Sequence, residues 1–552
     1  MGIPMKYRWH ANRFASLAMF LLFSTPIIVA AELHPGNSIE KSVRGGATET
    51  YSLNLVAGDV VSLLFTDTGQ DVILTVQTPK GEVARRFSSK NQQGQPVSFF
   101  APESGAWQLV LAGRDKAIEA AYKISAVKID KSESLLKPPE EILSPRLKQL
   151  SDAASVAKFW AEIEKTGAPL IEPLPDDSRN MLVTFVWRAP GETKGVLIEG
   201  QFCGPDNCFM KRLPSTDLWY ASLKINRRVR TYYSFAPDIP SVPQSDAGYS
   251  VVNAVSQRDP LNAKGWFESP EDPDVTIHHG VSRLEMPDAP AQPWADKRKD
   301  VPEGQVEKRS FTSALLKNTR DVSVYTPPGY SKTATPYGLL LVFDGDTYIN
   351  IVPTPAALDN LLADKRLPPL VAVIIGNAKG ARSTELPCNP QFADFLSNEL
   401  IPWVRRLYNV TSDPSQVTIG GSSYGGLAAT YAAFRHPEVF GNVLSQSGSY
   451  WWTPPTDPTK PNSFDPDSEH GYVADLFIHS PRLPIRFYLD AGSMEVDRSG
   501  QGSSILIPNR DLRNILIAKG YEVHYQEFQG AHDYLSWRGT LADGLILLVG
   551  GK

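Results

Sequence analysis

Residues 416–433 read QVTIGGSSYGGLAATYAA, and this stretch decides the fold of the C-terminal half of the chain. Ser423 lies between Gly421 and Gly425 in a Gly-x-Ser-x-Gly motif, which places a nucleophilic serine on a sharp turn between a strand and a helix. The apolar residues before the motif predict a buried strand, and the small residues after it predict a close-packed helix. We therefore predict that Ser423 is a nucleophile; the alternative is a tight turn whose serine only caps the helix.

The sequence on both sides of this motif alternates between apolar, strand-like runs and helical patterns. The strand-like runs are residues 322–325, 339–343, 371–375 and 485–489, and helical patterns such as residues 392–407 lie between them. Apolar strands that alternate with helices indicate a parallel sheet covered on both faces. We therefore predict an α/β-hydrolase domain with a mainly parallel sheet over residues 308–552.

The N-terminal half has a different pattern, rich in short strands. Residues 32–130 contain alternating apolar runs separated by turn residues, which predict a β-sandwich accessory domain. Residues 131–180 predict a helical linker with one helix over 145–166, and strands return over 181–266 in a second β-sandwich. The proline-rich residues 267–307 predict another linker. The expected fold is therefore multidomain, with two N-terminal β-sandwich domains before the hydrolase domain.

The first residues of the chain have the pattern of a secretory signal peptide. A basic segment containing Lys6, Arg8 and Arg13 precedes a short apolar run, which ends in small residues near Ala31. The apolar run is short for a membrane span and contains Pro26, so an uncleaved anchor is the less favoured alternative. We expect residues 1–31 to be removed, leaving no integral membrane segment and a periplasmic protein, with secretion as the second choice.

Composition restricts the function further. With 42% hydrophobic and 21% charged residues the chain is an ordinary globular protein, and its net charge of -5 argues against nucleic acid as a partner. The pattern contains no metal-ligand cluster and no phosphate-binding loop, so no cofactor is predicted.

The three cysteines fall into a pair and a single residue. Cys203 and Cys208 flank the turn-forming sequence Gly-Pro-Asp-Asn, so in an oxidising compartment we predict a disulfide between them. Cys388 has no partner of this kind and is expected to be free and buried.

A serine nucleophile needs a base, which in this fold follows the last strand. His532 follows the strand-like residues 521–528 and a glycine turn, which is the expected position. We predict that His532 is the base; the alternative is a histidine that caps the following helix.

The acid that orients the base is expected after the preceding strand. Residues 485–489 lead into a loop that carries Glu495, which we predict to be this acid. Asp490 and Asp497 in the same loop remain alternatives, as does a loop whose acidic residues are only solvated.

Stabilisation of the oxyanion requires two backbone N–H groups in this fold. The first belongs to the residue after the nucleophile, Tyr424. The second comes from an early loop between a strand and a helix, for which we propose Asp346, although the neighbouring Asp-Gly sequence is also typical of a simple turn.

Further segments resemble the enterochelin esterase family of α/β-hydrolases. They are RSTEL at 382–386, NPQF at 389–392, ELIPW at 399–403, RHPEVFG at 435–441, SQSGSYWW at 445–452 and HDYLSWRG at 532–539. Residues 183–188, 259–262 and 290–294 resemble the N-terminal sandwich domain of the same family. The resemblance implies hydrolysis of the serine ester bonds of catecholate trilactone siderophores such as enterobactin, free or as the ferric complex. It also implies the roles given above to Ser423, His532 and Glu495.

The same resemblance implies a set of substrate contacts. Arg382 of the Arg-x-x-Glu-Leu motif, which includes Glu385, is expected to face the catecholate anions, with Arg538 assisting. Tryptophans are expected to stack on the aromatic rings; they are Trp451, Trp452 and Trp537. The alternatives are a loop clamp in which Arg382 pairs with Glu385, and tryptophans that simply belong to the core.

The chain departs from the family pattern at Ser422, Tyr424 and Tyr348, where other residues are more usual. It also carries the first β-domain, which resembles the prepeptidase C-terminal type of accessory domain. Two alternative functions follow: a feruloyl or acetyl esterase acting on polysaccharides, and a non-catalytic siderophore-binding protein.

Overall fold

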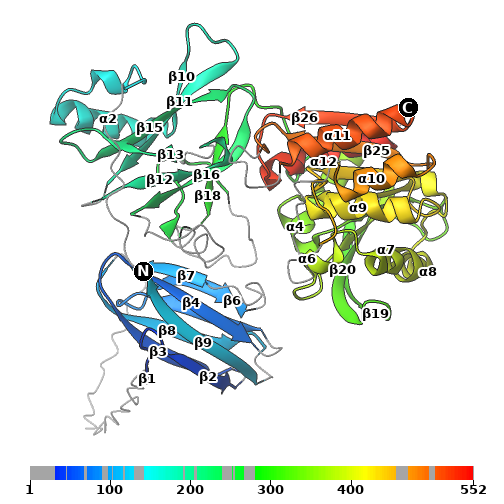
Figure 1. Cartoon of the computed structure of the whole chain (residues 1–552), viewed down its shortest axis with the longest axis horizontal. Helices are drawn as coiled ribbons and strands as arrows, with labels where there is room; N and C mark the ends of the chain where they lie inside the picture. The colour runs from blue at the N-terminus through cyan, green and yellow to red at the C-terminus, as the bar shows by residue number, and fades with distance from the viewer. Residues whose placement is uncertain are drawn as a thin grey trace, which may run out of the picture.

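The computed structural model describes residues 31–44, 46–67, 71–89, 97–101, 103–115, 119–129, 142–189, 193–203, 208–238, 252, 255–266, 280–455, 470–496 and 504–550. Most of the predicted signal peptide, residues 1–30, lies outside this set. Figure 1 shows two N-terminal β-rich regions and a C-terminal domain in which helices surround a sheet. Among the described residues, no helix is long and apolar enough to cross a membrane.

The first β-rich region consists of two sheets that enclose one apolar core. One sheet has the order β1-β3-β8-β5-β6 and the other β2-β9-β4-β7. The strands are β1 (Ala31–Glu32), β2 (Ser38–Val43), β3 (Thr48–Leu55), β4 (Asp59–Asp67), β5 (Val72–Gln77), β6 (Val83–Ser88), β7 (Val97–Ala101), β8 (Gly105–Gly113) and β9 (Ala120–Ile129). In β5 every second side chain is buried, as expected for a strand with one face toward a core.

A short helical segment follows, in which the predicted helix over 145–166 is shorter than expected. It consists of a 3₁₀ turn, η1 (Leu147–Gln149), and the helix α2 (Ala153–Thr166). The helix begins at Ala153 because the Asp152 side chain accepts a hydrogen bond from the Ser155 backbone N–H, which forms a capping box. It ends as predicted, before Gly167, whose φ is 82°.

The second β-rich region also has two sheets, of orders β10-β11-β15-β14 and β13-β12-β16-β18-β17. Its elements are β10 (Leu170–Pro173), β11 (Asn180–Arg188), β12 (Val196–Glu199), η2 (Gln201–Cys203), β13 (Cys208–Phe209), β14 (Lys211–Arg212), β15 (Leu218–Asn226), β16 (Arg230–Pro237), β17 (Gly265–Trp266) and β18 (Val281–Glu285). The predicted bounds, 181–266, are too narrow. The strand β10 pairs with β11, and β18, placed in the predicted linker 267–307, pairs with β16. Both strands lie in irregular, proline-containing sequence, and their pairing partners determine their conformation.

The C-terminal domain contains an eight-stranded mixed sheet of order β19-β20-β22-β21-β23-β24-β25-β26. The strands are β19 (Gln305–Ser313), β20 (Asn318–Thr326), β21 (Gly338–Val342), β22 (Leu370–Ile375), β23 (Val417–Ser422), β24 (Asn442–Gln446), β25 (Arg486–Gly492) and β26 (Glu522–Phe528). β20 runs antiparallel to its neighbours β19 and β22, whereas the pairings from β22 to β26 are parallel. Four strands that are neighbours in the sheet, β23 to β26, therefore end at the same edge.

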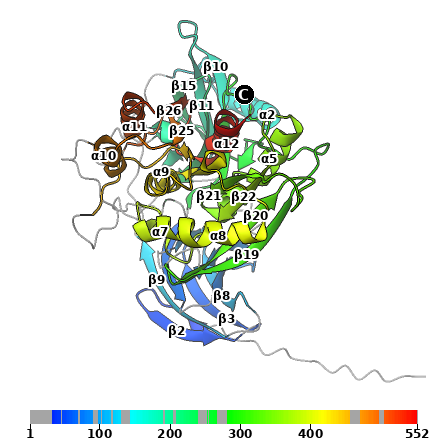
Figure 2. The ribbon, with the colours of Figure 1, turned by 90° about the vertical axis from the view of Figure 1, so that its right-hand side faces the viewer.

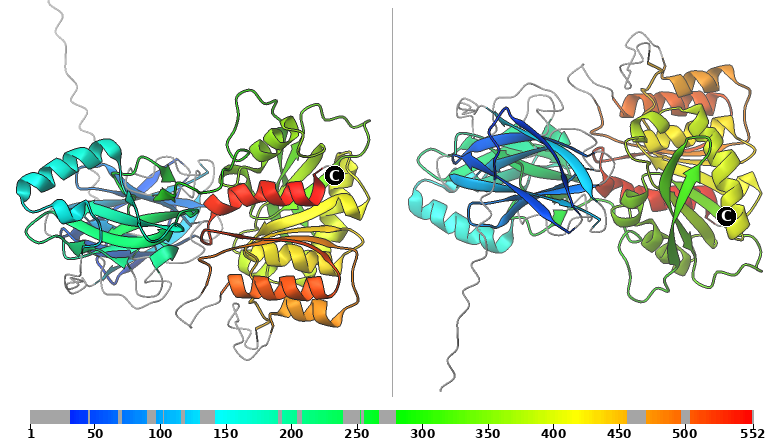
Figure 3. Two further views of the ribbon diagram at one scale, coloured as in Figure 1. Left: turned by 90° about the horizontal axis from the view of Figure 1, so that it is seen from above. Right: turned by 90° about the horizontal axis from the view of Figure 1, so that it is seen from below.

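Helices cover both faces of this sheet, which explains the continuous apolar strands. In β21, Leu339 and Leu341 belong to one core cluster and Leu340 and Val342 to the other. The first face carries α7 (Pro390–Phe395), η3 (Leu396–Leu400), α8 (Ile401–Leu407), α9 (Tyr424–Arg435), α10 (Tyr472–His479) and α11 (Leu506–Ala518). The second carries α4 (Gly345–Asn350), α5 (Thr354–Ala363) and α12 (Tyr534–Val549). Figure 3 shows α11 and α12 on opposite sides of the strands.

The three parts of the chain contact one another. Val60 of the first β-rich region packs against Leu197 and Ala236 of the second. The Lys379 ammonium group donates to the Asp67 carboxylate at 2.7 Å, which joins the first region to the C-terminal domain. This contact lies near α6 (Arg382–Glu385), and Figure 2 shows the first region below the C-terminal domain.

Candidate active site

The Gly-x-Ser-x-Gly motif forms the sharp turn that the sequence predicts. β23 ends at Ser422, α9 begins at Tyr424, and Ser423 between them has φ 56° and ψ -121°. A side chain other than glycine rarely adopts such a φ, and holding it costs about 1–3 kcal/mol. Gly421 is required because a Cβ there would lie 3.0 Å from Gly425 Cα. Ser423 is therefore not a simple helix cap, and no side-chain cap hydrogen bond forms at this end of α9.

Contacts with β24 and the following loop hold the Ser423 turn. The Ser423 backbone N–H donates to the Gln446 carbonyl at 2.9 Å, and the Ser449 N–H donates to the Ser423 carbonyl at 3.2 Å. The Ser423 and Ser449 hydroxyl oxygens are 3.3 Å apart and share a hydrogen bond. Ser449 is buried, and its place in the SQSGSYWW segment is the only sequence signal that pointed to it.

His532 and Glu495 form a direct pair at the same edge of the sheet. The Glu495 Oε1 atom lies 2.7 Å from His532 Nδ1, while Glu495 Oε2 accepts the Gly492 backbone N–H at 2.7 Å. The Glu495 side chain is 0% exposed and the His532 side chain 28% exposed. A carboxylate on Nδ1 holds the imidazole in the tautomer whose Nε2 can accept a proton. His532 and Ser423 are not hydrogen-bonded to each other; both lie where the parallel strands end.

The alternatives to these residues have other contacts. Asp490 accepts the Ser447 backbone N–H at 3.0 Å and the Tyr488 hydroxyl at 3.3 Å, and does not reach His532. Its complete burial raises the pKa of this carboxyl to about 8. Asp497 lies outside the described residues. The residue that caps α12 is Asp533, not His532, because the Asp533 side chain accepts the Ser536 backbone N–H.

The two proposed oxyanion donors begin neighbouring helices. Tyr424 is the first residue of α9, and Asp346 is the second residue of α4, which follows β21. β21 and β23 are parallel neighbours, so both helices start at the edge that carries Ser423. The first N–H groups of a helix have no partner within that helix, and such groups can stabilise an anion.

Arg382 is fixed beside the serine turn by Asp344, which the sequence analysis missed. The Arg382 Nε and Nη2 atoms donate to the two Asp344 carboxylate oxygens at 2.7 and 2.8 Å. Burial lowers the pKa of the guanidinium, but the Asp344 charge outweighs burial and the net shift is upward. The arginine also lies over the Tyr424 ring, at 5.8 Å from its centroid, and its side chain is 32% exposed. Arg382 thus stays charged and partly accessible next to the serine.

Glu385 does not share this environment, and the alternative of an Arg382–Glu385 clamp does not hold, because Arg382 pairs with Asp344. The buried Glu385 carboxylate accepts from Arg320 at 2.8 Å and from the Asn318 amide at 2.6 Å. This ion pair between α6 and β20 satisfies Glu385 within the protein. In this structure the motif glutamate serves the fold, and the substrate contact at Glu385 stays a prediction.

The other predicted substrate contacts also have structural partners. Arg538 is buried and pairs with Asp296. Trp537 is buried, donates from Nε1 to the Ser447 hydroxyl at 2.9 Å, and meets the His532 ring edge-on with centroids 4.7 Å apart. Trp537 therefore supports the histidine from the core. Trp452 is buried, whereas Trp451 is partly exposed and lies 6.1 Å from the Tyr424 ring.

The predicted cysteine states are present in the structure. Cys203 and Cys208 form a disulfide, and Cys388 is free and buried. Within the described residues, no three His, Cys, Asp or Glu side chains are grouped so that they could hold a metal ion.

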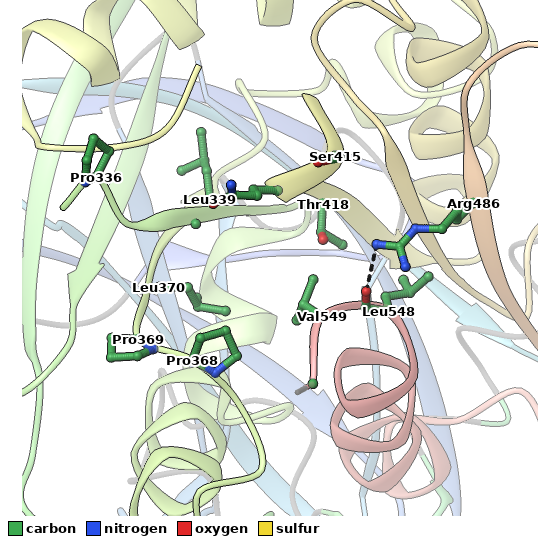
Figure 4. A pocket seen from close by; sticks show the side chains of 13 residues that line it. Pro336, Leu339, Pro368, Pro369, Leu370, Ser415, Thr418, Arg486, Leu548 and Val549 are labelled. Atoms are coloured by element: carbon green, nitrogen blue, oxygen red, sulfur yellow. Dashed lines mark hydrogen bonds between the residues drawn. The ribbon is translucent and has the colours of Figure 1, made fainter. Parts of the chain in front are cut away.

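A cavity of about 350 Å³ lies at the opposite edge of the sheet, away from Ser423 (Figure 4). Residues near the amino ends of β21, β22, β23 and β25 line it together with the end of α12. Arg486 at its wall donates to the Leu548 carbonyl at 2.9 Å. The cavity is thus separate from the edge where Ser423, Glu495 and His532 lie.

Comparison with known proteins agrees with this arrangement. A family model described as enterochelin esterase, N-terminal, matches residues 182–295, and one described as putative esterase matches residues 313–548. Neither model covers the first β-rich region.

Known relatives match about two thirds or more of the chain. The chain is 30% identical over 434 residues to the iron(III) enterobactin esterase of Dickeya dadantii, covering 73% of this chain and 94% of that protein. It is 32% identical over 393 residues to the iron(III) enterobactin esterase of Escherichia coli O6:H1, covering 66% of this chain and 90% of that protein.

A solved structure extends the similarity to the fold. The crystal structure of the enterobactin esterase of Shigella flexneri in the presence of enterobactin matches with a TM-score of 0.56 and 30% identity. The match covers 72% of this chain and 98% of that one. With the serine turn and the Glu495–His532 pair at one sheet edge and relatives of this extent, the chain belongs to the enterobactin (enterochelin) esterase family.

Proposed function

We propose that this chain is an exported serine esterase that hydrolyses the ester bonds of a catecholate trilactone siderophore of the enterobactin type. The observation that carries the proposal is the Glu495–His532 pair at 2.7 Å, at the sheet edge where the Ser423 turn presents its hydroxyl. Membership of a family whose named members are iron(III) enterobactin esterases supports the substrate class.

In the proposed reaction His532 Nε2 accepts the proton of Ser423 as its oxygen attacks the ester carbonyl. Glu495 holds Nδ1–H and stabilises the imidazolium charge that forms. The Tyr424 and Asp346 N–H groups stabilise the oxyanion. The imidazolium then protonates the oxygen of the departing serine of the substrate, which leaves as a hydroxyl group. Water, deprotonated by His532, attacks the acyl group and releases it from Ser423. For the first proton transfer the Ser423 hydroxyl hydrogen must point toward His532, and Ser449 is then the donor in the hydrogen bond that the two hydroxyls share.

Arg382 is the proposed contact for the substrate's negative charge. Its Nη1 atom has no hydrogen-bond partner among the described residues, while Nε and Nη2 are held by Asp344. A guanidinium fixed in this way loses little freedom when it binds an anion, and a ferric tris-catecholate is anionic. Iron enters this site only as part of the substrate.

The test is ester hydrolysis by the purified mature protein on enterobactin, its ferric complex and methyl ferulate. Ser423→Ala is the matched control. Cleavage of enterobactin or its ferric complex that disappears in the variant supports the proposal. Activity on methyl ferulate alone would support the serine esterase mechanism but indicate a feruloyl ester as the substrate. No activity on any of the esters would favour a non-catalytic binding protein.

Export to the periplasm is a separate part of the proposal. It is supported by the basic and apolar pattern of residues 1–31 and by the Cys203–Cys208 disulfide, which is typical of an oxidising compartment. N-terminal sequencing of the protein from fractionated cells tests it. A new N-terminus near residue 32 in the periplasmic fraction is expected; an intact Met1 in the cytoplasm would contradict export.

A further inference from the structure

The loop that carries His532 is held by a different part of the chain. The histidine loop is defined as residues 529–535, which are the connection from β26 to α12 and the first two residues of α12. Four hydrogen bonds tie it to residues in or next to the second β-rich region. They are Arg230 N–H to the Gln529 carbonyl at 3.2 Å, Thr231 hydroxyl to Asp533 at 2.8 Å, His532 N–H to Gln201 at 2.9 Å and Gln292 amide to the Leu535 carbonyl at 2.6 Å.

The Thr231–Asp533 contact is the most protected of the four. Thr231 and Asp533 are each 1% exposed, and they are 302 positions apart in the chain. The Thr231 hydroxyl in β16 donates to Asp533 Oδ2, while Oδ1 caps α12 through Ser536. Without the Thr231 hydroxyl, this buried carboxylate oxygen would lose its donor, which costs the desolvation free energy of that oxygen. The bond therefore holds Asp533, the residue next to His532, in place.

Gln201 reaches the histidine itself. Its side-chain oxygen accepts the His532 backbone N–H, and it opens the turn η2, which the Cys203–Cys208 disulfide closes on the other side. Phe202 in the same turn stacks on Phe185 of β11, with ring centroids 5.3 Å apart. The turn is therefore anchored by a covalent bond and by the apolar core, and both fix the place of Gln201.

The acid of the pair is also in contact with the second β-rich region. Met494, which precedes Glu495, packs against the apolar core of that region. The Met494 backbone N–H donates to the Gly530 carbonyl at 3.0 Å, which joins the acid loop to the histidine loop. Both members of the Glu495–His532 pair thus lie on segments that the second β-rich region contacts.

We propose that the second β-rich region is a positioning element of the esterase site. It holds the histidine loop through Thr231 and Gln201, and the Cys203–Cys208 disulfide keeps Gln201 in place. The inference rests on the proposed role of His532 as the base. Thr231 and Gln201 touch no reacting atom; they act through the position of His532.

The first experiment compares Thr231→Val with Thr231→Ser in the full chain. Valine has nearly the same shape but no hydroxyl, whereas serine retains the donor for Asp533. The readouts are the rate at which a fluorophosphonate labels Ser423, and kcat and KM on enterobactin. A small displacement of a reacting group can cost on the order of 100-fold in rate. We expect Thr231→Val to lower the labelling rate and kcat together by roughly 10–100-fold with KM little changed, and Thr231→Ser to restore most of both.

Thr184→Val is the matched control. Thr184 is equally buried in the same region, its hydroxyl is 2.9 Å from that of Ser222, and it does not contact the histidine loop. We expect Thr184→Val to have a lower melting temperature than the wild type but the same labelling rate. It therefore shows what a loss of stability alone does to labelling. Equal labelling by Thr231→Val and the wild type, or an equal loss in Thr184→Val, would overturn the inference.

The second experiment concerns Gln201 and the Cys203–Cys208 disulfide that holds it in place. Gln201→Ala removes the acceptor for His532 and is expected to slow labelling by roughly 3–10-fold, the value of one hydrogen bond, whereas Gln201→Glu retains an acceptor oxygen. Dithiothreitol supplies the two electrons and two protons that convert the disulfide to two thiols. It should slow labelling of the wild type and of Cys388→Ser, but not of the Cys203→Ser/Cys208→Ser variant, which should already be slow.

Labelling separates this inference from the proposed substrate, because the probe contains no siderophore. If the protein is labelled, and Thr231→Val slows that labelling, but enterobactin is not cleaved, the positioning role is supported and the proposed siderophore substrate is wrong. Labelling that is insensitive to both Thr231→Val and dithiothreitol would overturn the positioning role, even with full enterobactin hydrolysis.

Discussion

The serine turn and the histidine loop reach the same edge of one sheet, but they are held in different ways. Ser423 is fixed by its own strand and helix and by backbone contacts to β24, all within the C-terminal domain. His532 lies in a loop whose hydrogen bonds lead to Gln201 and Thr231, about 300 positions earlier. The proposed nucleophile thus depends on local sequence, whereas the proposed base depends on an interface. A change in the second β-rich region is expected to act on the base and to leave the serine turn intact.

The largest effect tests the serine half of this comparison. Removing the proposed nucleophile in Ser423→Ala is expected to lower kcat by about 10⁴-fold or more, because the oxygen that would carry the acyl group is lost. The measurement is enterobactin hydrolysis at saturating substrate. Ser415→Ala, which lies at the opposite edge of the sheet, is the control and should retain activity. Full activity of Ser423→Ala would remove the serine from the reaction.

The next effect tests which carboxylate serves the base. Glu495→Gln keeps the side-chain size but removes the charge beside Nδ1, and is expected to lower kcat by roughly 10³–10⁴-fold. Asp490→Asn is the matched change at the carboxyl that does not contact His532, and it should cost far less. A larger loss in Asp490→Asn than in Glu495→Gln would reverse the assignment.

Two buried aspartates, Asp490 in β25 and Asp533 in the histidine loop, predict that the stability of the protein depends on pH. Burial raises the pKa of Asp490 to about 8 and that of Asp533 to about 7, above the ordinary 3.8. Because the folded protein holds these protons more tightly than the unfolded chain, their stabilising contribution is full below pH 3.8. It is lost as pH rises through 7 and 8. We expect the melting temperature to fall between pH 5 and pH 9.

Asn replacements measure how much each of the two carboxyls contributes to the fall of the melting temperature. Asp490→Asn and Asp533→Asn should each flatten the curve of melting temperature against pH, and Asp490→Asn should remove the part nearest pH 8. The exposed Asp300 supplies the control Asp300→Asn, which should follow the wild type. If the wild-type melting temperature rose from pH 5 to pH 9, the direction given for both carboxyls would be wrong.

The smallest effect concerns the contact between the Ser423 and Ser449 hydroxyls. Ser449→Ala removes one neutral hydrogen bond, which contributes about 0.5–1.5 kcal/mol, so kcat should fall by roughly 3–10-fold. KM should change little if Ser449 acts only on the orientation of Ser423. The two constants on one ester substrate decide this point, and a loss as large as that of Ser423→Ala would give Ser449 a direct part in the reaction.

Local patterns predicted much of the C-terminal domain. The buried strand before Ser423, the helix after it and the strand that precedes the His532 loop each have the residue types of their element, and the structure has β23, α9 and β26 at these places. The choice of Glu495 over Asp490 followed from the sequence Gly-x-x-acid, residues 492–495, after the strand. The structure gives the reason: Asp490 still belongs to β25 and is used by Ser447, whereas Glu495 lies in the loop that faces His532.

Substrate contacts were harder to predict because motif residues can serve either the fold or the site. Arg382 and Glu385 lie in one turn, yet Arg382 pairs with Asp344 and remains partly exposed while Glu385 is buried against Arg320. Trp537 and Arg538 lie in a segment that resembles the family and are both buried. Spacing along the chain does not reveal which side chains the core encloses.

The sequence by itself determined the serine turn, the chain order of Ser423, Glu495 and His532, the disulfide pair and the division into β-rich and α/β parts. These depend on residues close together in the chain, where backbone conformation and hydrophobic period act directly. Only the tertiary structure decided the bounds of the second β-rich region, the partners of Arg382 and Glu385, and the contacts of Gln201 and Thr231 with the histidine loop. Strand pairing, burial and hydrogen bonds across hundreds of positions depend on which surfaces the fold brings together.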